Sequence, residues 1–136
     1  MRTATGTFEI TDMSEETYAE LESGVRLTRA GGTQRFAGDL EGEGSVEWVM
    51  CYLPDGTASY EGLQLVTATL NGLRGGLVMR STGHHDGSQS RGEWTVIEGS
   101  GTGELAGVTG KGTFTASGGP SGSYTLDFDG GSSPAA

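Results

Sequence analysis

Polar and apolar residues alternate along most of this chain. From Thr5 to Thr11, Phe8 and Ile10 fall on one side of an extended backbone, and the polar residues fall on the other. A period of two is typical of a half-buried β-strand. Similar runs, rich in Thr, Val, Leu and aromatic residues, follow at about residues 25–40, 44–53, 57–70, 73–83, 90–98, 110–117 and 122–129. The pattern therefore predicts about eight strands.

Turn signals separate these runs. The segment from Pro54 to Thr57 combines a fixed proline φ with a glycine, and Asn71-Gly72 is typical of a two-residue hairpin turn. The acidic segment 12–24 is the one plausible place for a helix. Ser14 would cap a single helical turn there, or the segment would form an irregular loop.

A meander of short hairpins leaves two sheet edges unpaired unless the sheet closes on itself. Unpaired edges invite aggregation, and closure removes them. We therefore expect one all-β domain over residues 1–129, folded as a closed antiparallel eight-stranded barrel, with a two-sheet sandwich as the alternative. The Gly-, Ser- and Pro-containing segment 130–136 is expected to be a disordered tail.

Residue parity predicts which side chains point into such a barrel. An eight-stranded barrel is just wide enough to be filled by side chains or to hold one small ligand. A ring-lined interior with a few polar tips is typical of a ligand pocket, and a solid core is the alternative. The expected inner residues include Phe8, Trp48, Met50, Tyr52, Tyr60, Gln64, Leu77, Met79, Ser81, Trp94 and Tyr124.

Charge narrows the range of partners. The chain carries 18 acidic and 8 basic residues, a net charge of −10. Such a field repels phosphate backbones and anionic membrane surfaces, so we expect neither nucleic acid nor membrane as a partner. No apolar run is long enough to span a bilayer, and the N-terminus lacks the features of a signal peptide. A soluble, cytoplasmic location is therefore expected.

The histidines and the cysteine suggest no metal or covalent chemistry. His84 and His85 are neighbours in an extended run, so they point to opposite faces and make a poor chelate, with no third histidine to help. Cys51 is the only cysteine and has no basic neighbour, so it is expected to be inert. We expect no metal.

The charged residues of the middle strands are expected on the outside. Parity turns Glu47, Glu61 and Arg80 outward, although a one-residue slip in register would bring them in. The glycine pattern at 101–106 matches a dinucleotide fingerprint, but Gly107 and Gly110 break the helix that this motif needs. No cofactor is therefore expected.

Several blocks of the sequence together resemble the bacterial DUF3224 family. They are Gly6 to Ile10, Glu15-Glu16, Phe36 to Gly44, Gly62-Leu63, Ser100 to Gly107 and Tyr124 to Asp127. The resemblance implies an allene-oxide-cyclase-like barrel, related in shape to lipocalin-like and dirigent barrels. Relatives with this barrel shape lead us to expect a homo-oligomer. They include cyclases and isomerases that fold an apolar substrate without a cofactor. The chain departs from the family pattern at Ser81, where a histidine is common, and at Gln64, where a glutamate is frequent.

By analogy with that fold, the leading hypothesis is a cofactor-independent cyclase or isomerase for a hydrophobic, polyketide-like intermediate. Holding one productive conformer would lower the barrier to cyclisation. The expected catalytic hydrogen-bonding residues are Tyr52, Gln64 and Ser81. The expected ligand-binding residues are Phe8, Trp48, Met50, Tyr60, Leu77, Met79, Trp94 and Tyr124. A non-catalytic carrier of a hydrophobic small molecule is the alternative, and a solidly packed structural module is a third possibility.

Overall fold

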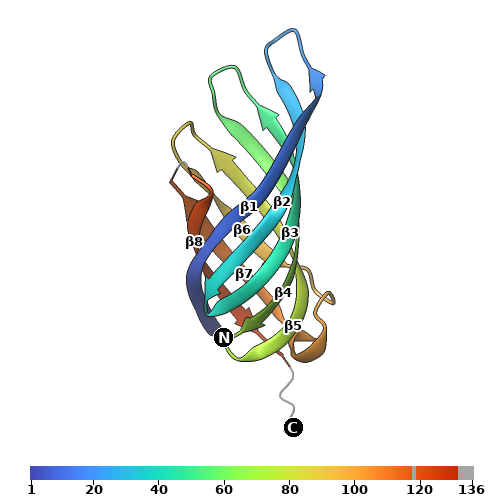
Figure 1. Ribbon diagram of the computed structural model, residues 1–136, viewed down its shortest axis with the longest axis vertical. Coiled ribbons are helices and arrows are strands. Elements are labelled where there is room, and N and C mark those ends of the chain that lie inside the picture. The colour runs from blue at the N-terminus through green and yellow to red at the C-terminus, as the bar shows by residue number, and fades with distance from the viewer. Residues whose placement is uncertain (118, 132–136) are drawn as a thin grey trace.

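The computed structural model describes residues 1–117 and 119–131 and forms one closed antiparallel barrel. Its eight strands follow one another in chain order, and β1 closes the barrel against β8 (Figure 1). The strands are β1 Arg2–Glu20, β2 Arg26–Gly38, β3 Leu40–Tyr52, β4 Ala58–Leu70, β5 Leu73–His85, β6 Ser90–Val96, β7 Thr109–Ala116 and β8 Ser121–Asp129, with a 3-10 turn, η1, at Gly103–Leu105. The predicted barrel is confirmed. None of the described helical residues forms a segment long and apolar enough to cross a membrane.

The two ends of the barrel are built differently. Pairing of β1 with β8 runs from Arg2 opposite Phe128 to Glu9 opposite Ser121, and beyond that level β1 pairs with β2 alone. The hairpins β1–β2 and β3–β4 therefore rise above the β7–β8 turn, as Figure 1 shows. We call the end with the rising hairpins the open end. The opposite end, where the segment 97–102 covers the edge of β5 below Met79, is the closed end.

The predicted helical turn or irregular loop at 12–24 is wrong. The strand β1 continues to Glu20, and only a tight turn remains, in which the Gly24 N–H donates to the Leu21 carbonyl and Gly24 has φ of +94°. The reason is that this segment pairs with β2 as an antiparallel ladder that runs from Asp12 opposite Thr33 to Glu20 opposite Arg26. Glu16 lies opposite Arg29, and Glu20 lies opposite Arg26, so unlike charges face each other across the two strands and favour the extended form.

The interior follows the predicted parity. A large buried cluster fills the closed end and is centred on Trp94, whose ring lies 5.4 Å from the Phe8 ring, 5.5 Å from Phe114 and 5.4 Å from Tyr124. A smaller cluster of Ala30, Val46 and Trp48 lies toward the open end.

The predicted disordered tail at 130–136 lies, from residue 132 onward, outside the described residues. Its first residue is tied to the barrel, because the Arg2 guanidinium donates a hydrogen bond of 2.8 Å to the Gly130 carbonyl.

Candidate ligand-binding cavity

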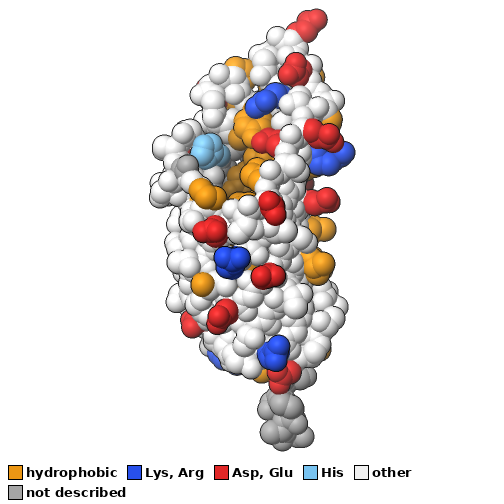
Figure 2. All heavy atoms as spheres, viewed as in Figure 1, with side chains coloured by type: hydrophobic (Ala, Val, Ile, Leu, Met, Phe, Trp, Pro, Cys, Tyr) orange, Lys and Arg blue, Asp and Glu red, His pale blue; other side chains and the backbone are white. Residues whose placement is uncertain are grey.

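A cavity of about 130 Å³ lies inside the barrel toward the open end. Five aromatic side chains form part of its wall, from Phe8, Trp48, Tyr60, Trp94 and Phe114. Its polar lining residues are Gln34, Gln64, Ser81 and Ser90. Ile10, Met13, Met50, Ala116, Gly119 and Pro120 complete it. Figure 2 shows a hollow with apolar side chains in this part of the molecule and a histidine beside it.

Two buried polar atoms in this lining lack a protein partner. The Gln64 amide donates through Nε2 to Gln34 Oε1 at 2.9 Å, and both side chains are buried. Gln64 Oε1 and Trp48 Nε1 make no hydrogen bond to any described residue. A buried polar atom left unpaired costs about 1–3 kcal/mol. Both residues line the cavity, so these two atoms are the candidate hydrogen-bonding groups for a bound molecule.

The local sequence around Gln64 reverses the usual polarity of a barrel strand. Gln64 points inward with 1% of its surface exposed, whereas its neighbours Leu63 and Leu65 point outward. The register is fixed by Tyr60 and Val66, which share the inner face, so Gln64 cannot turn outward without exposing them. A polar group is thus held inside against its ordinary preference.

Tyr60 is the only titratable side chain among the described residues that line the cavity. Its ring lies across β5 at Gly83, where any β-carbon would overlap the phenol ring. It meets the Trp48 ring edge-on, with 6.1 Å between ring centroids. Burial raises the pKa of Tyr60, and a smaller opposing effect comes from a hydrogen bond with Ser90. The hydroxyl is therefore neutral over the physiological pH range, and the described lining holds no carboxylate or imidazole.

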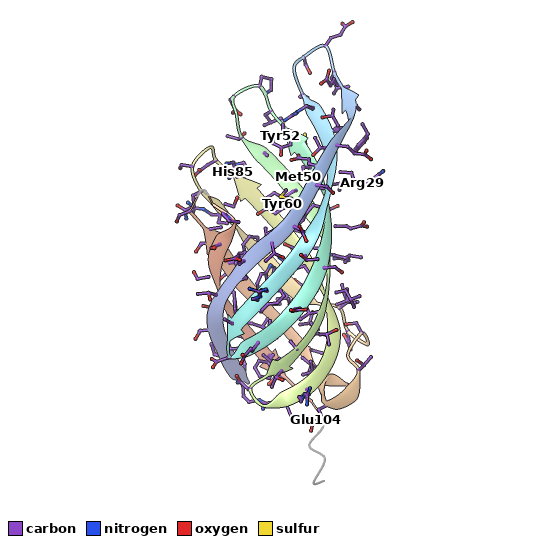
Figure 3. All side chains as sticks on the ribbon, in the orientation of Figure 1. Arg29, Met50, Tyr52, Tyr60, His85 and Glu104 are labelled. Atoms are coloured by element: carbon purple, nitrogen blue, oxygen red, sulfur yellow. The ribbon has the colours of Figure 1, made fainter. Side chains whose placement is uncertain are left out.

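The two histidines lie on opposite faces, as adjacent strand residues must. His85 Nδ1 is 2.9 Å from the hydroxyl of Ser90, which lines the cavity, whereas His84 is exposed and faces Ser59. Figure 3 shows His85 on the β5–β6 side of the opening, near Tyr60 and Met50. No group of three or more His, Cys, Asp or Glu in the described parts of the chain is placed to hold a metal ion.

The structure brings most of the predicted site residues together. Those that line the cavity are Phe8, Trp48, Met50, Tyr60, Gln64, Ser81 and Trp94. The charged residues Glu47, Glu61 and Arg80 are exposed on the outer surface, as parity predicts.

Four predicted site residues do not line the cavity. Tyr52 lies further toward the open end, where its hydroxyl donates to Glu15 Oε2 at 2.6 Å. Leu77, Met79 and Tyr124 belong to the packed cluster of the closed end. The Tyr124 hydroxyl accepts a hydrogen bond from the Leu40 N–H at 2.9 Å and contacts the Ala37 and Leu40 carbonyls at 3.0 Å. Parity gives the face of a residue but not its height along the barrel.

Sequence reasoning missed several lining residues for identifiable reasons. Gln34 lies two residues before Phe36 in the same strand, so alternation predicts that both point inward. The sequence does not predict the hydrogen bond between Gln34 and Gln64. Met13 was hidden by the expectation of a helix or loop at 12–24. Gly119 and Pro120 come from the β7–β8 turn, and turn residues carry no parity signal.

Fold and cavity together define a small closed β-barrel with an apolar, ring-lined interior. The family model described as "Protein of unknown function (DUF3224)" matches residues 4–128, and the chain belongs to this family. It is similar to the crystal structure of a protein with unknown function from the DUF3224 family from Shewanella oneidensis MR-1, with a TM-score of 0.82 and 28% sequence identity. That likeness covers 97% of this chain and 99% of the other. No curated protein matches the chain.

Proposed function

We propose that this barrel binds a small neutral molecule, about the size of one six-membered ring, that carries one hydroxyl group. The observation that carries the proposal is the pair of unpartnered polar atoms, Gln64 Oε1 and Trp48 Nε1, in the lining of an otherwise apolar cavity. A hydroxyl both donates and accepts, so it is the kind of ligand group that is able to pair with either atom.

The cavity volume supports a ligand of this size. A dry cavity of about 150 Å³ in another protein takes up benzene, whereas pockets for drug-sized molecules span about 300–1,000 Å³. At about 130 Å³ this cavity is close in volume to the cavity that takes up benzene.

The electrostatics support a neutral ligand. The described lining contains no charged side chain, so it provides no counter-ion for an ammonium or a carboxylate. The net charge of −10 further disfavours the approach of an anion.

Binding is better supported than catalysis. Cyclisation by shape alone requires a cavity that encloses the folded substrate. A polyketide-like chain is larger than the six-membered ring that a cavity of about 130 Å³ accommodates. Acid–base isomerisation requires a base near the reacting carbon, and the described lining offers only the neutral phenol of Tyr60. The cyclase or isomerase stays a hypothesis, and carriage or sensing of a small molecule is our proposal.

Phenol and toluene test the proposal, because they differ by a hydroxyl in place of a methyl group. We expect both to bind and phenol to bind roughly fivefold or more tightly, since its hydroxyl is able to pair with a buried atom that toluene leaves unpaired. The chain has two tryptophans, so the indole N–H region of a proton–nitrogen correlation spectrum is simple to read, and Trp48→Phe assigns its signals. Phenol is expected to shift the Trp48 indole signal.

Variants of the polar pair give the decisive comparison. Gln64→Met removes the acceptor and is expected to bring phenol affinity down to that of toluene, while Gln89→Met makes the same change at the β5–β6 turn and is expected to leave both affinities unchanged. If neither probe shifts any tryptophan signal at millimolar concentration, the interior is effectively filled and the proposal fails.

A further inference from the structure

The outer surface of β3, β4 and β5 carries an apolar patch where a barrel wall normally faces water with polar residues. Leu63 is 53% exposed, Leu65 is 58% exposed and Val49 is 45% exposed. Val78 lies beside Leu65 in the β4–β5 ladder and extends the patch onto β5. We call Val49, Leu63, Leu65 and Val78 the outer patch. Apolar side chains are visible along one edge of the molecule in Figure 2.

This patch is contiguous, which distinguishes it from scattered surface hydrophobes. Leu63 and Leu65 are consecutive outward positions of β4, and Val49 sits diagonally from Leu63 across the β3–β4 ladder. Isolated exposed leucines need no explanation, but contiguous apolar surface marks interaction sites.

Opposite charges flank the patch on either side. Glu47 of β3 and Arg80 of β5 are the direct cross-strand neighbours of Leu63, so the three side chains form one row across three strands. Two strand spacings, about 10 Å, separate the two charges, too far for them to pair. Within the described residues the only ion pair joins the Met1 amino group to Asp129, so neither Glu47 nor Arg80 forms an ion pair with another described residue of its own chain.

We propose that the outer patch is the contact surface between two copies of this chain, related by a two-fold axis that runs parallel to β4. Such a rotation puts Leu63 and Leu65 against their own copies. It also exchanges the two ends of the charged row, so Glu47 faces Arg80 of the second copy, and Arg80 faces Glu47 of the second copy.

The charge pattern selects both this occupant and this axis. The row has Glu47 at one end, Leu63 in the centre and Arg80 at the other end. Rotation about an axis parallel to the strands brings unlike charges together at both ends. An axis in the same plane but perpendicular to the strands would bring like charges together. The contact spans about three strands of a convex wall. We therefore expect a reversible dimer with a dissociation constant on the order of micromolar or weaker.

Sedimentation velocity over about 1–500 µM tests the dimer. The wild-type chain is expected to shift from monomer to dimer within this range, and Leu65→Glu is expected to remain monomeric. Glu47→Arg and Arg80→Glu each convert both symmetric contacts to like charges, and each is expected to weaken association about tenfold. The double variant, Glu47→Arg with Arg80→Glu, restores opposite charges and is expected to recover wild-type association.

Matched controls lie on the other side of the barrel. Glu93→Arg on β6 and Lys111→Glu on β7 make the same kinds of charge change at exposed positions outside the patch, and they are expected to leave association unaltered. Thermal melts check that every variant folds. A wild-type chain that stays monomeric throughout, or a dimer that survives Leu65→Glu, overturns the proposal, as does a double variant no better than its parents.

Discussion

The two tryptophans share the inner face of the barrel but have different surroundings. Trp94 is 1% exposed and packs against Phe8, Phe36, Phe114 and Tyr124, with ring centroids between 5.4 and 5.8 Å away. Trp48 has one aromatic neighbour, Tyr60, and otherwise borders the cavity and the smaller cluster. Both rings border the cavity, but Trp94 is packed among four other rings and Trp48 against one.

This difference leads to a prediction on stability. Trp94→Ala removes a ring that packs against four others and is expected to lower the free energy of unfolding by about 3–5 kcal/mol. Trp48→Ala is expected to cost clearly less, because its ring packs against one aromatic ring rather than four. Urea unfolding followed by far-UV circular dichroism measures both. Equal losses would show that Trp48 is as tightly packed as Trp94.

Gln64 departs from the inward-apolar pattern of its strand. An apolar residue of similar size would pack in this barrel without leaving an acceptor unpaired, yet a polar side chain occupies the position. Departures from the inward-apolar pattern are expected at functional sites.

At the scale of elements, the extension of β1 beyond the β8 pairing forms one wall of the open end. Glu15 on this extension accepts hydrogen bonds from Thr28 of β2 at 2.7 Å and from Tyr52 of β3 at 2.6 Å. One carboxylate oxygen therefore ties three strands together, and it holds Tyr52 toward the open end rather than at the cavity. The Arg26 guanidinium stacks over the Tyr52 ring at 4.6 Å.

The tie predicts a shift in the titration of Tyr52. Its pKa is raised to about 12, first by desolvation and then by the hydrogen bond and the negative charge of Glu15. Because the folded value lies above the ordinary value of about 10, its contribution to stability is complete below about pH 10 and is lost as the pH rises toward 12. Glu15→Gln is expected to lower the pKa of Tyr52 while leaving it above 10, since desolvation remains.

Phenolate absorbance during an alkaline titration measures this shift, with Tyr52→Phe identifying the contribution of Tyr52. Glu16→Gln is the matched control, because Glu16 lies next along the strand and faces Arg29 instead. An unchanged titration in Glu15→Gln would show that the Glu15 contact does not persist in solution.

At the scale of the whole molecule, the barrel has two ends of different construction. The closed end holds the large cluster, and there the segment 97–102 covers the edge of β5, with the Ile97 and Thr102 N–H groups donating to the Val78 and Gly76 carbonyls. At the open end the outer edge of β1 has no described strand partner beyond Ile10, whose N–H donates to the Pro120 carbonyl. Acidic residues, among them Asp12, Glu15 and Glu16, lie along this free segment, and charge discourages pairing with another chain's edge.

Hydrogen exchange should separate the two halves of β1. Backbone amides at 3–9 that pair with β2 or β8 are expected to exchange slowly, whereas about every second amide at 11–20 points away from β2 and is expected to exchange much faster. The strand β3 is the internal control, because it pairs with β2 on one side and β4 on the other. Uniform protection along β1 would mean that another chain or segment covers its free edge.

Much of the fold was readable from the sequence, and one element was not. Alternation predicted strands in Gly44 to Leu53 and in Thr57 to Leu70, because a buried inner face imposes a period of two on the residues themselves. The segment 12–24 lacked this signal, since nearly all of its residues are exposed on both faces. Its strand exists because β2 satisfies its backbone, which is a tertiary cause.

For the candidate site, the sequence determined the face of each residue and the tertiary structure decided its position. Parity put Trp48, Gln64 and Tyr124 inside, and it did so correctly because side chains alternate along any strand. Strand register and tilt then carried Tyr124 to the packed end and Gln64 to the cavity, where it meets Gln34 from a strand 30 residues earlier. No local pattern encodes that meeting, because it depends on how separate strands line up once the barrel closes.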